Sequence, residues 1–205
     1  RKVRLCRSDR YAFVDHKPQK WPTCLLRFFS NEKTSKNMTT TASEIHEIIH
    51  TGRLTIGLIC SHGGHLTEML QLMDAFDGHD VFFLSYDAPT TSQLKRAYLV
   101  PNMARNPVEF AKNLFRVHRI FKKERPDLLI STGAEIALPA AVIARLLGIP
   151  FLYIECGAQV FCPSMTGRIM YWLADRFLVQ WPELLDKYGG RARFRGSLID
   201  KDSCA

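Results

Sequence analysis

The chain has 205 residues and a formal net charge of +8, from 28 Lys and Arg against 20 Asp and Glu. Ten of the basic and three of the acidic residues lie within residues 1–37, so that segment carries +7 and the remainder is close to neutral. A basic charge confined to one end argues against nucleic-acid binding by the folded body of the protein. The length allows one α/β domain with an appendage.

We assign residues 1–50 to a basic N-terminal extension. Residues 1–37 contain no glycine and no sustained periodicity, and the first methionine is Met38. Three interpretations remain open: a disordered basic arm, a targeting peptide, or upstream sequence wrongly attached to a protein that begins at Met38. The apolar run at residues 24–29 is too short for a signal peptide, which favours disorder or mis-attachment.

Strand and helix patterns alternate through residues 51–200, before a short tail at residues 201–205. We expect strands at residues 55–60, 81–85, 128–130, 151–154, 176–179 and 192–195. Helices are expected at residues 43–50, 65–73, 107–123, 136–147, 167–174 and from 181 onward, with a loop and a brief polar helix at 88–101. This alternation predicts an α/β fold, a Rossmann-like parallel sheet flanked by helices. Arg145, Gly148 and Pro150 divide the longest apolar stretch, so we expect no transmembrane helix.

Three polar turns follow predicted strands, at Ser61–His65, Thr132–Glu135 and Glu155–Gly157. Ligands of parallel sheets bind beyond the carboxyl ends of the strands, where these turns would lie. The first two turns contain glycine and precede helices, an arrangement that can place backbone N–H groups against a phosphate. We therefore predict that both turns converge on one anion, with these candidate residues: Ser61, Gly63, Gly64, Thr132 and Gly133.

Three side chains in these turns are candidate catalytic residues. His65 could act as a general base, because imidazole titrates near neutral pH, or could merely order its loop. Glu135 could bind a ligand hydroxyl, act as a base or stabilise a helix N-terminus. Glu155 should lie at the edge of the sheet rather than deep inside, in a site role or a structural hydrogen bond. His62 and His65 have no third ligand at helpful spacing, so we expect no metal, and no cofactor is predicted.

The helix predicted at residues 107–123 combines an apolar stripe with a basic remainder. Such a helix usually packs one face on a sheet, but a basic face with aromatic residues also suits an anionic membrane surface. The candidate membrane contacts are Phe110, Lys112, Phe115, Arg116, Arg119 and Lys122. A second apolar and aromatic segment, residues 161–172, could be core, a membrane face or a partner interface.

Five motifs in order within residues 54–199 resemble one protein family. They read SHGGHLTE at 61–68, STGAEIALPA at 131–140, GIPFLYIE at 148–155, PSMTGR at 163–168 and ADRFLVQWPEL at 174–184. Together they resemble the Alg-fourteen family of asparagine-linked glycosylation and its bacterial PssD-like relatives. The resemblance implies the acceptor-side half of a GT-B glycosyltransferase, similar to the first domain of MurG.

By this resemblance, the glycine turns would face the diphosphate of a polyprenyl-diphosphate-linked sugar, the acceptor. His65 falls on the histidine of the family's Gly-Gly-His motif. A separate donor-binding subunit would supply the UDP-sugar, usually of N-acetylglucosamine or glucuronic acid, and the transfer would invert the sugar linkage. The expected location is peripheral, at the cytoplasmic face of a membrane. Only eight residues follow Ser197, so we expect no second nucleotide-binding domain. The alternative is a non-catalytic membrane scaffold that recruits the catalytic partner.

Overall fold

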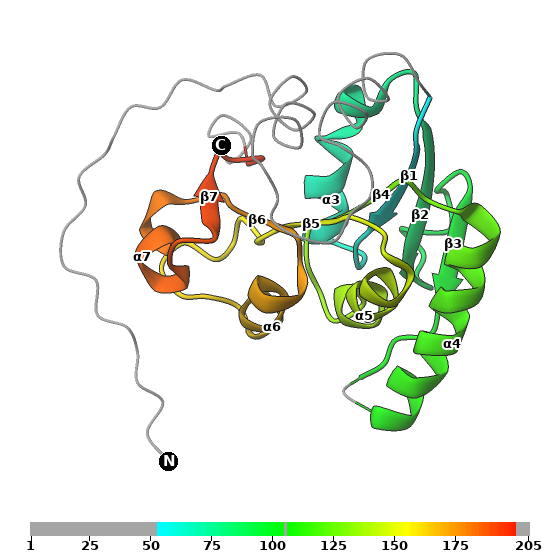
Figure 1. Ribbon diagram of the computed structural model, residues 1–205. Coiled ribbons are helices and arrows are strands. Elements are labelled where there is room, and N and C mark those ends of the chain that lie inside the picture. Colours follow the sequence, from blue (N-terminus) through cyan, green and yellow to red (C-terminus); the bar gives the residue numbers. More distant parts are fainter. Residues whose placement is uncertain (1–52, 105, 200–205) are drawn as a thin grey trace.

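The structure is a computed structural model that describes residues 53–104 and 106–199. The extension predicted at residues 1–50, with its expected helix at Ser43–His50, and the tail at residues 201–205 lie outside these ranges. The described part of the chain is a parallel β-sheet with helices on both faces (Figure 1).

One sheet contains the seven strands found among the described residues. They are β1 (Thr55–Ile59), β2 (Asp80–Tyr86), β3 (Ala97–Val100), β4 (Leu128–Ser131), β5 (Phe151–Ile154), β6 (Arg176–Val179) and β7 (Ala192–Phe194). Their order is β3-β2-β1-β4-β5-β6-β7, and every neighbouring pair is parallel. The chain reverses its direction across the sheet between β1 and β4, which is where ligands of such sheets bind. The predicted Rossmann-like fold is confirmed.

Successive residues of the strands point to opposite faces of the sheet and belong to two separate hydrophobic cores. Phe82, Leu84 and Tyr86 of β2 face the α5-side core, which lies beneath α4 (Pro107–Glu124), α5 (Ala137–Leu147) and α6 (Met165–Leu173). Phe83 belongs to the α3-side core, beneath α3 (Gly64–Leu70) and the short helix η1 (Met73–Phe76). Figure 1 shows α4, α5 and α6 next to one another along one face of the sheet. Helices η2 (Pro182–Leu184) and α7 (Leu185–Tyr188) precede β7.

Strand β3 corrects the prediction of a loop and a polar helix at residues 88–101. Ala97–Val100 pair with Phe83–Tyr86 at the edge of the sheet. Three of the four residues of this strand are only half-buried. An edge strand has one hydrogen-bonded neighbour and needs less apolar surface, so its four-residue run gave a weak signal beside Lys95 and Arg96.

Helix α4 follows its predicted boundaries because both of its ends are capped. The Asn106 side chain accepts a hydrogen bond from the Val108 N–H at 2.9 Å, and Pro107 occupies the first turn. At the other end Arg125 is left-handed, with φ of 48°, and Pro126 follows it. These local signals are readable in the sequence, which is why the helix was predicted to within one residue.

Candidate functional site

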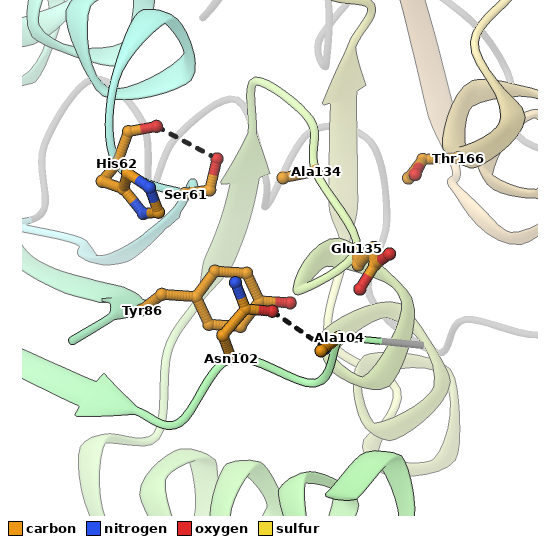
Figure 2. A pocket seen from close by; sticks show the side chains of 8 residues that line it. All are labelled: Ser61, His62, Tyr86, Asn102, Ala104, Ala134, Glu135 and Thr166. Carbon is orange, nitrogen blue, oxygen red and sulfur yellow. Dashed lines mark hydrogen bonds between the residues drawn. The ribbon is translucent and has the colours of Figure 1, made fainter. Parts of the chain in front are cut away.

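The first two predicted turns meet at one pocket at the carboxyl ends of β1 and β4. The pocket has a volume of about 460 Å³, within the usual range for small-molecule sites. Its lining residues are Ser61, His62, Tyr86, Asn102, Ala104, Ala134, Glu135 and Thr166 (Figure 2). Ser61 and Glu135 were predicted site residues, and both lie here. His62, Tyr86, Asn102, Ala104, Ala134 and Thr166 were not among the predicted set.

His65 and Thr132 join the two turns through a pair of hydrogen bonds. The Nδ1 atom of His65 lies 2.9 Å from the backbone oxygen of Thr132, and the Thr132 hydroxyl donates to the backbone oxygen of His65 at 2.7 Å. A carbonyl oxygen can only accept, so Nδ1 of His65 is the donor in this contact. Thr132 is fully buried and its hydroxyl is used in this contact. The pair therefore fixes the rim of the pocket.

The glycines of the two turns have different physical roles. Gly133 has a φ of 120°, and a Cβ atom at this position would lie 2.8 Å from Cε1 of His65. The contact with the His65 ring therefore requires glycine at this position. Gly63 and Gly64 are exposed, and a Cβ atom on either would meet no other atom within 4 Å. Their backbone is open to the approach of a ligand.

Glu155 lies at the carboxyl end of β5 but not at an open edge, which corrects the expected exposure. It is 0% exposed and does not line the pocket. Its carboxylate accepts hydrogen bonds from the Cys156 N–H at 3.0 Å, the Ser164 hydroxyl at 3.2 Å and the Tyr188 hydroxyl. Ser164 also caps α6 by accepting from the Gly167 N–H at 2.7 Å. Glu155 thus stabilises the start of α6 through its hydrogen bond with the capping residue Ser164.

A second buried carboxylate, Glu68 of α3, was missed by the sequence interpretation. It is 6% exposed and accepts from the Gly157 N–H at 3.0 Å and from Nε2 of Gln180 at 2.8 Å. Burial raises the pKa of Glu68, and these donors partly offset the rise. Gln180 also donates to the Glu155 backbone oxygen at 3.0 Å and accepts from the Leu198 N–H at 2.7 Å. The network connects α3 to the ends of β5 and β6.

The predicted membrane contacts on α4 fall into three groups. Phe110 packs against the α5-side core. Lys112 and Arg116 form ion pairs with Glu109, at 2.6 and 3.4 Å. Phe115 is 74% exposed, and the exposed Arg119 and Lys122 form no ion pair with another described residue.

The exposed apolar surface of the protein gathers on α4, α5 and α6. Eight large hydrophobic side chains are exposed among the described residues, and six of them lie on these three helices. They are Val108, Phe115, Leu146, Met165, Ile169 and Trp172. Segment 161–172 is therefore divided, because its Met170 and Tyr171 are buried in the core. Within residues 53–104 and 106–199, no helix is long and apolar enough to cross a membrane.

The family to which the chain belongs follows from sequence comparison. The profile of the family described as oligosaccharide biosynthesis protein Alg14 like matches residues 95–198, just over half of the chain. The chain is a member of this family. Homo sapiens ALG14, named as a UDP-N-acetylglucosamine transferase subunit, is 26% identical over 174 residues, 66% of this chain and 79% of that protein. The predicted resemblance and the glycosyltransferase-subunit class are confirmed at the level of the family.

Two longer proteins resemble this chain, one in sequence and one in structure. A Staphylococcus haemolyticus N-acetylglucosamine transferase acting on a pyrophosphoryl-undecaprenol substrate is 27% identical over 160 residues, 68% of this chain and 44% of that protein. Acinetobacter baumannii MurG superposes with a TM-score of 0.59 at 21% identity, covering 72% of this chain and 47% of that chain. The Alg14-like chain thus spans about half the length of these proteins, and the structural likeness shows its fold.

Proposed function

We propose that this chain is the acceptor-binding and membrane-recruiting subunit of a UDP-N-acetylglucosamine transferase, with a separate subunit binding the donor. One observation carries the proposal: the turns after β1 and β4 meet at a single pocket at the carboxyl edge of the sheet. The names of its family relatives favour N-acetylglucosamine over glucuronic acid as the transferred sugar.

The acceptor in this proposal is a polyprenyl-diphosphate-linked sugar. Its diphosphate would lie against Gly63 and Gly64, where the backbone is exposed and no side chain intervenes. Ser61, beside them, lines the pocket and is within reach of the same ligand. Thr132 and Gly133 would contribute indirectly, because they hold the His65 ring in place.

Glu135 is the better candidate for the general base, because it lines the pocket whereas His65 does not. An inverting transfer needs a base that removes the proton of the attacking acceptor hydroxyl. His65 would position the turn at residues 132–134 through Nδ1, and Glu155, enclosed under α6, would position that helix. Both are positioning residues in this assignment.

Substitutions in the complex reconstituted with the donor-binding subunit test these roles. Glu135→Gln should lower kcat by about 10²- to 10⁴-fold. In His65→Asn the side-chain amide can replace Nδ1 as donor to the Thr132 oxygen, so we expect most of the turnover to remain, and His65→Ala to lose it. A loss in His65→Asn as large as that in Glu135→Gln would move the base assignment to His65. Unchanged turnover in every variant would favour the non-catalytic scaffold.

Donor binding provides a second test of the division between subunits. The isolated chain should bind UDP-N-acetylglucosamine weakly, and the complex should bind it well. Isothermal titration of each with the same nucleotide sugar measures the difference. Tight binding by the isolated chain would contradict the proposal.

Membrane recruitment would use the outer surface of α4, α5 and α6, at the cytoplasmic face of a membrane. This surface combines the exposed Phe115 and Trp172 with Arg119 and Lys122, two exposed cations that form no ion pair within the described part of the chain. Replacing Phe115 and Trp172 together by Ser should reduce sedimentation of the chain with anionic liposomes. Leu70→Ser is the matched control, because Leu70 is 47% exposed on α3 at the opposite face of the sheet. An equal loss in the control would refute this surface.

A further inference from the structure

Tyr86, at the end of β2, lies in the pocket with an unsatisfied hydroxyl group. The residue is 4% exposed, and its hydroxyl forms no hydrogen bond with any described residue. Figure 2 shows the phenol among the lining residues, with its oxygen end turned toward Glu135. A buried polar group without a partner is rare in folded proteins and destabilises them.

Packing does not account for a tyrosine at this position. The Tyr86 ring belongs to the α5-side core, which a phenylalanine would fill equally well without burying a lone hydroxyl. Burial, and then the nearby charge of Glu135, raise the pKa of Tyr86. The backbone N–H of Met103 partly offsets that rise without meeting the geometry of a hydrogen bond. The hydroxyl is thus a neutral donor at physiological pH.

Asn102, an exposed residue, also lines the pocket and is held by a local hydrogen bond. Its Oδ1 accepts a hydrogen bond from the Ala104 N–H at 2.9 Å, which holds the loop that follows β3. This contact leaves the side-chain NH₂ group as a donor at the pocket. The pocket lining therefore includes two neutral donor residues, Tyr86 and Asn102, and one acceptor, the carboxylate of Glu135.

This set of groups selects between the two parts of a lipid-diphosphate sugar. A sugar hydroxyl can donate to the Glu135 carboxylate and accept from Tyr86 or Asn102. A diphosphate only accepts hydrogen bonds and so offers no donor to that carboxylate, whereas the exposed backbone at Gly63 and Gly64 is open to it.

We propose that Tyr86 and Asn102 bind the acceptor's sugar ring, donating hydrogen bonds to its oxygen atoms while the diphosphate stays at Gly63 and Gly64. This inference rests on the proposed function and adds to it the residues that distinguish a sugar-bearing lipid from a bare lipid diphosphate. Tyr86 and Asn102 are then specificity residues rather than parts of the chemical step.

The test measures the binding of two probes to the full chain. One is a short-chain polyprenyl diphosphate, and the other is the same lipid carrying one N-acetylglucosamine. Wild type should bind the sugar-bearing lipid more tightly. Tyr86→Phe should reduce this preference by about three- to tenfold, the loss of one hydrogen bond, and leave the affinity for the bare lipid unchanged. Its urea midpoint should not fall, because the substitution removes an unpaired hydroxyl.

Two further variants make the test specific. Asn102→Asp keeps the oxygen that accepts from Ala104 but removes the donor, and should also reduce the preference. Ser85→Ala removes another buried hydroxyl that has no hydrogen-bond partner among the described residues. Ser85 does not line the pocket, so the preference should stay unchanged. An unchanged preference in both Tyr86→Phe and Asn102→Asp would overturn this inference but not the proposed function. Equal binding of both lipids by wild type would also overturn it, and binding of neither would overturn the proposed function as well.

Discussion

Replacing Gly133 by Ala tests whether the rim of the pocket depends on the contact between this glycine and the His65 ring. The new Cβ atom would lie 2.8 Å from Cε1 and 3.0 Å from Nδ1 of the ring. The φ of 120° at this position is also strained for any residue with a Cβ atom. The ring must then move, and its hydrogen bond to the Thr132 oxygen would break.

The two effects give a predicted magnitude. The strained backbone costs about 1–3 kcal/mol and the lost hydrogen bond about 0.5–1.5 kcal/mol. We therefore expect Gly133→Ala to lower the free energy of unfolding by about 2–4 kcal/mol, measured by urea denaturation followed by circular dichroism. Gly148→Ala is the control, because Gly148 has a φ of 70° and open space around it, and should cost only about 1–2 kcal/mol.

A double-mutant cycle with His65→Ala separates strain from contact. Without the ring, Gly133→Ala should retain only its backbone strain, so the two substitutions should couple by about 1 kcal/mol. If their effects add to within about 0.5 kcal/mol, the ring contact is not what requires glycine, and the reasoning is refuted.

Three further substitutions probe the buried carboxylates. Burial raises the pKa of Glu68 above its usual 4.5, so the protonated form contributes stability below pH 4.5 that is lost as the pH rises through the folded-state pKa. Glu68→Gln should remove this component, and an unchanged pH profile of urea unfolding would contradict it. Ser164→Ala, which removes the cap of α6 and a donor to Glu155, should lower the unfolding free energy by about 1–2 kcal/mol in the same assay. Gly167→Ala would drive a methyl group into the Glu155 carboxylate, so we expect a loss of about 2–3 kcal/mol in unfolding free energy and a lower thermal midpoint. A thermal midpoint equal to that of the wild type would argue against this close packing.

The central strands and α4 could be predicted because their signals are local. Each of β1, β2, β4, β5 and β6 is a short, mostly apolar run whose residues are mainly buried, which is typical of central strands in a parallel sheet. Strand β3 could not be predicted, because an edge strand is stabilised by its one neighbour rather than by its own composition.

The backbone of the site was predictable and most of its side chains were not. Glycine turns after strands indicate the carboxyl edge without knowledge of the fold. Tyr86 and Asn102 reach the pocket from the ends of β2 and β3, and no sequence spacing relates them to Glu135. Glu68 and Glu155 each accept a hydrogen bond from a segment far along the chain, 89 and 33 residues away. Their burial therefore depends on tertiary contacts.

These buried contacts explain how a helix as short as α3 is held in place next to the turn that supplies Ser61 and His62 to the pocket. An isolated helix of seven residues is unstable in water, so its position depends on contacts outside it. His65 binds the turn after β4, and Glu68, one turn later, binds the turn after β5 and Gln180 after β6. With α3 held at both points, the exposed glycines at its start are positioned before any ligand arrives, which lowers the ordering cost of binding. The raised pKa of Glu68 is the energetic cost of that arrangement. To accept hydrogen bonds from the turn after β5 and from Gln180, the carboxylate has to be buried, and burial disfavours its charged form.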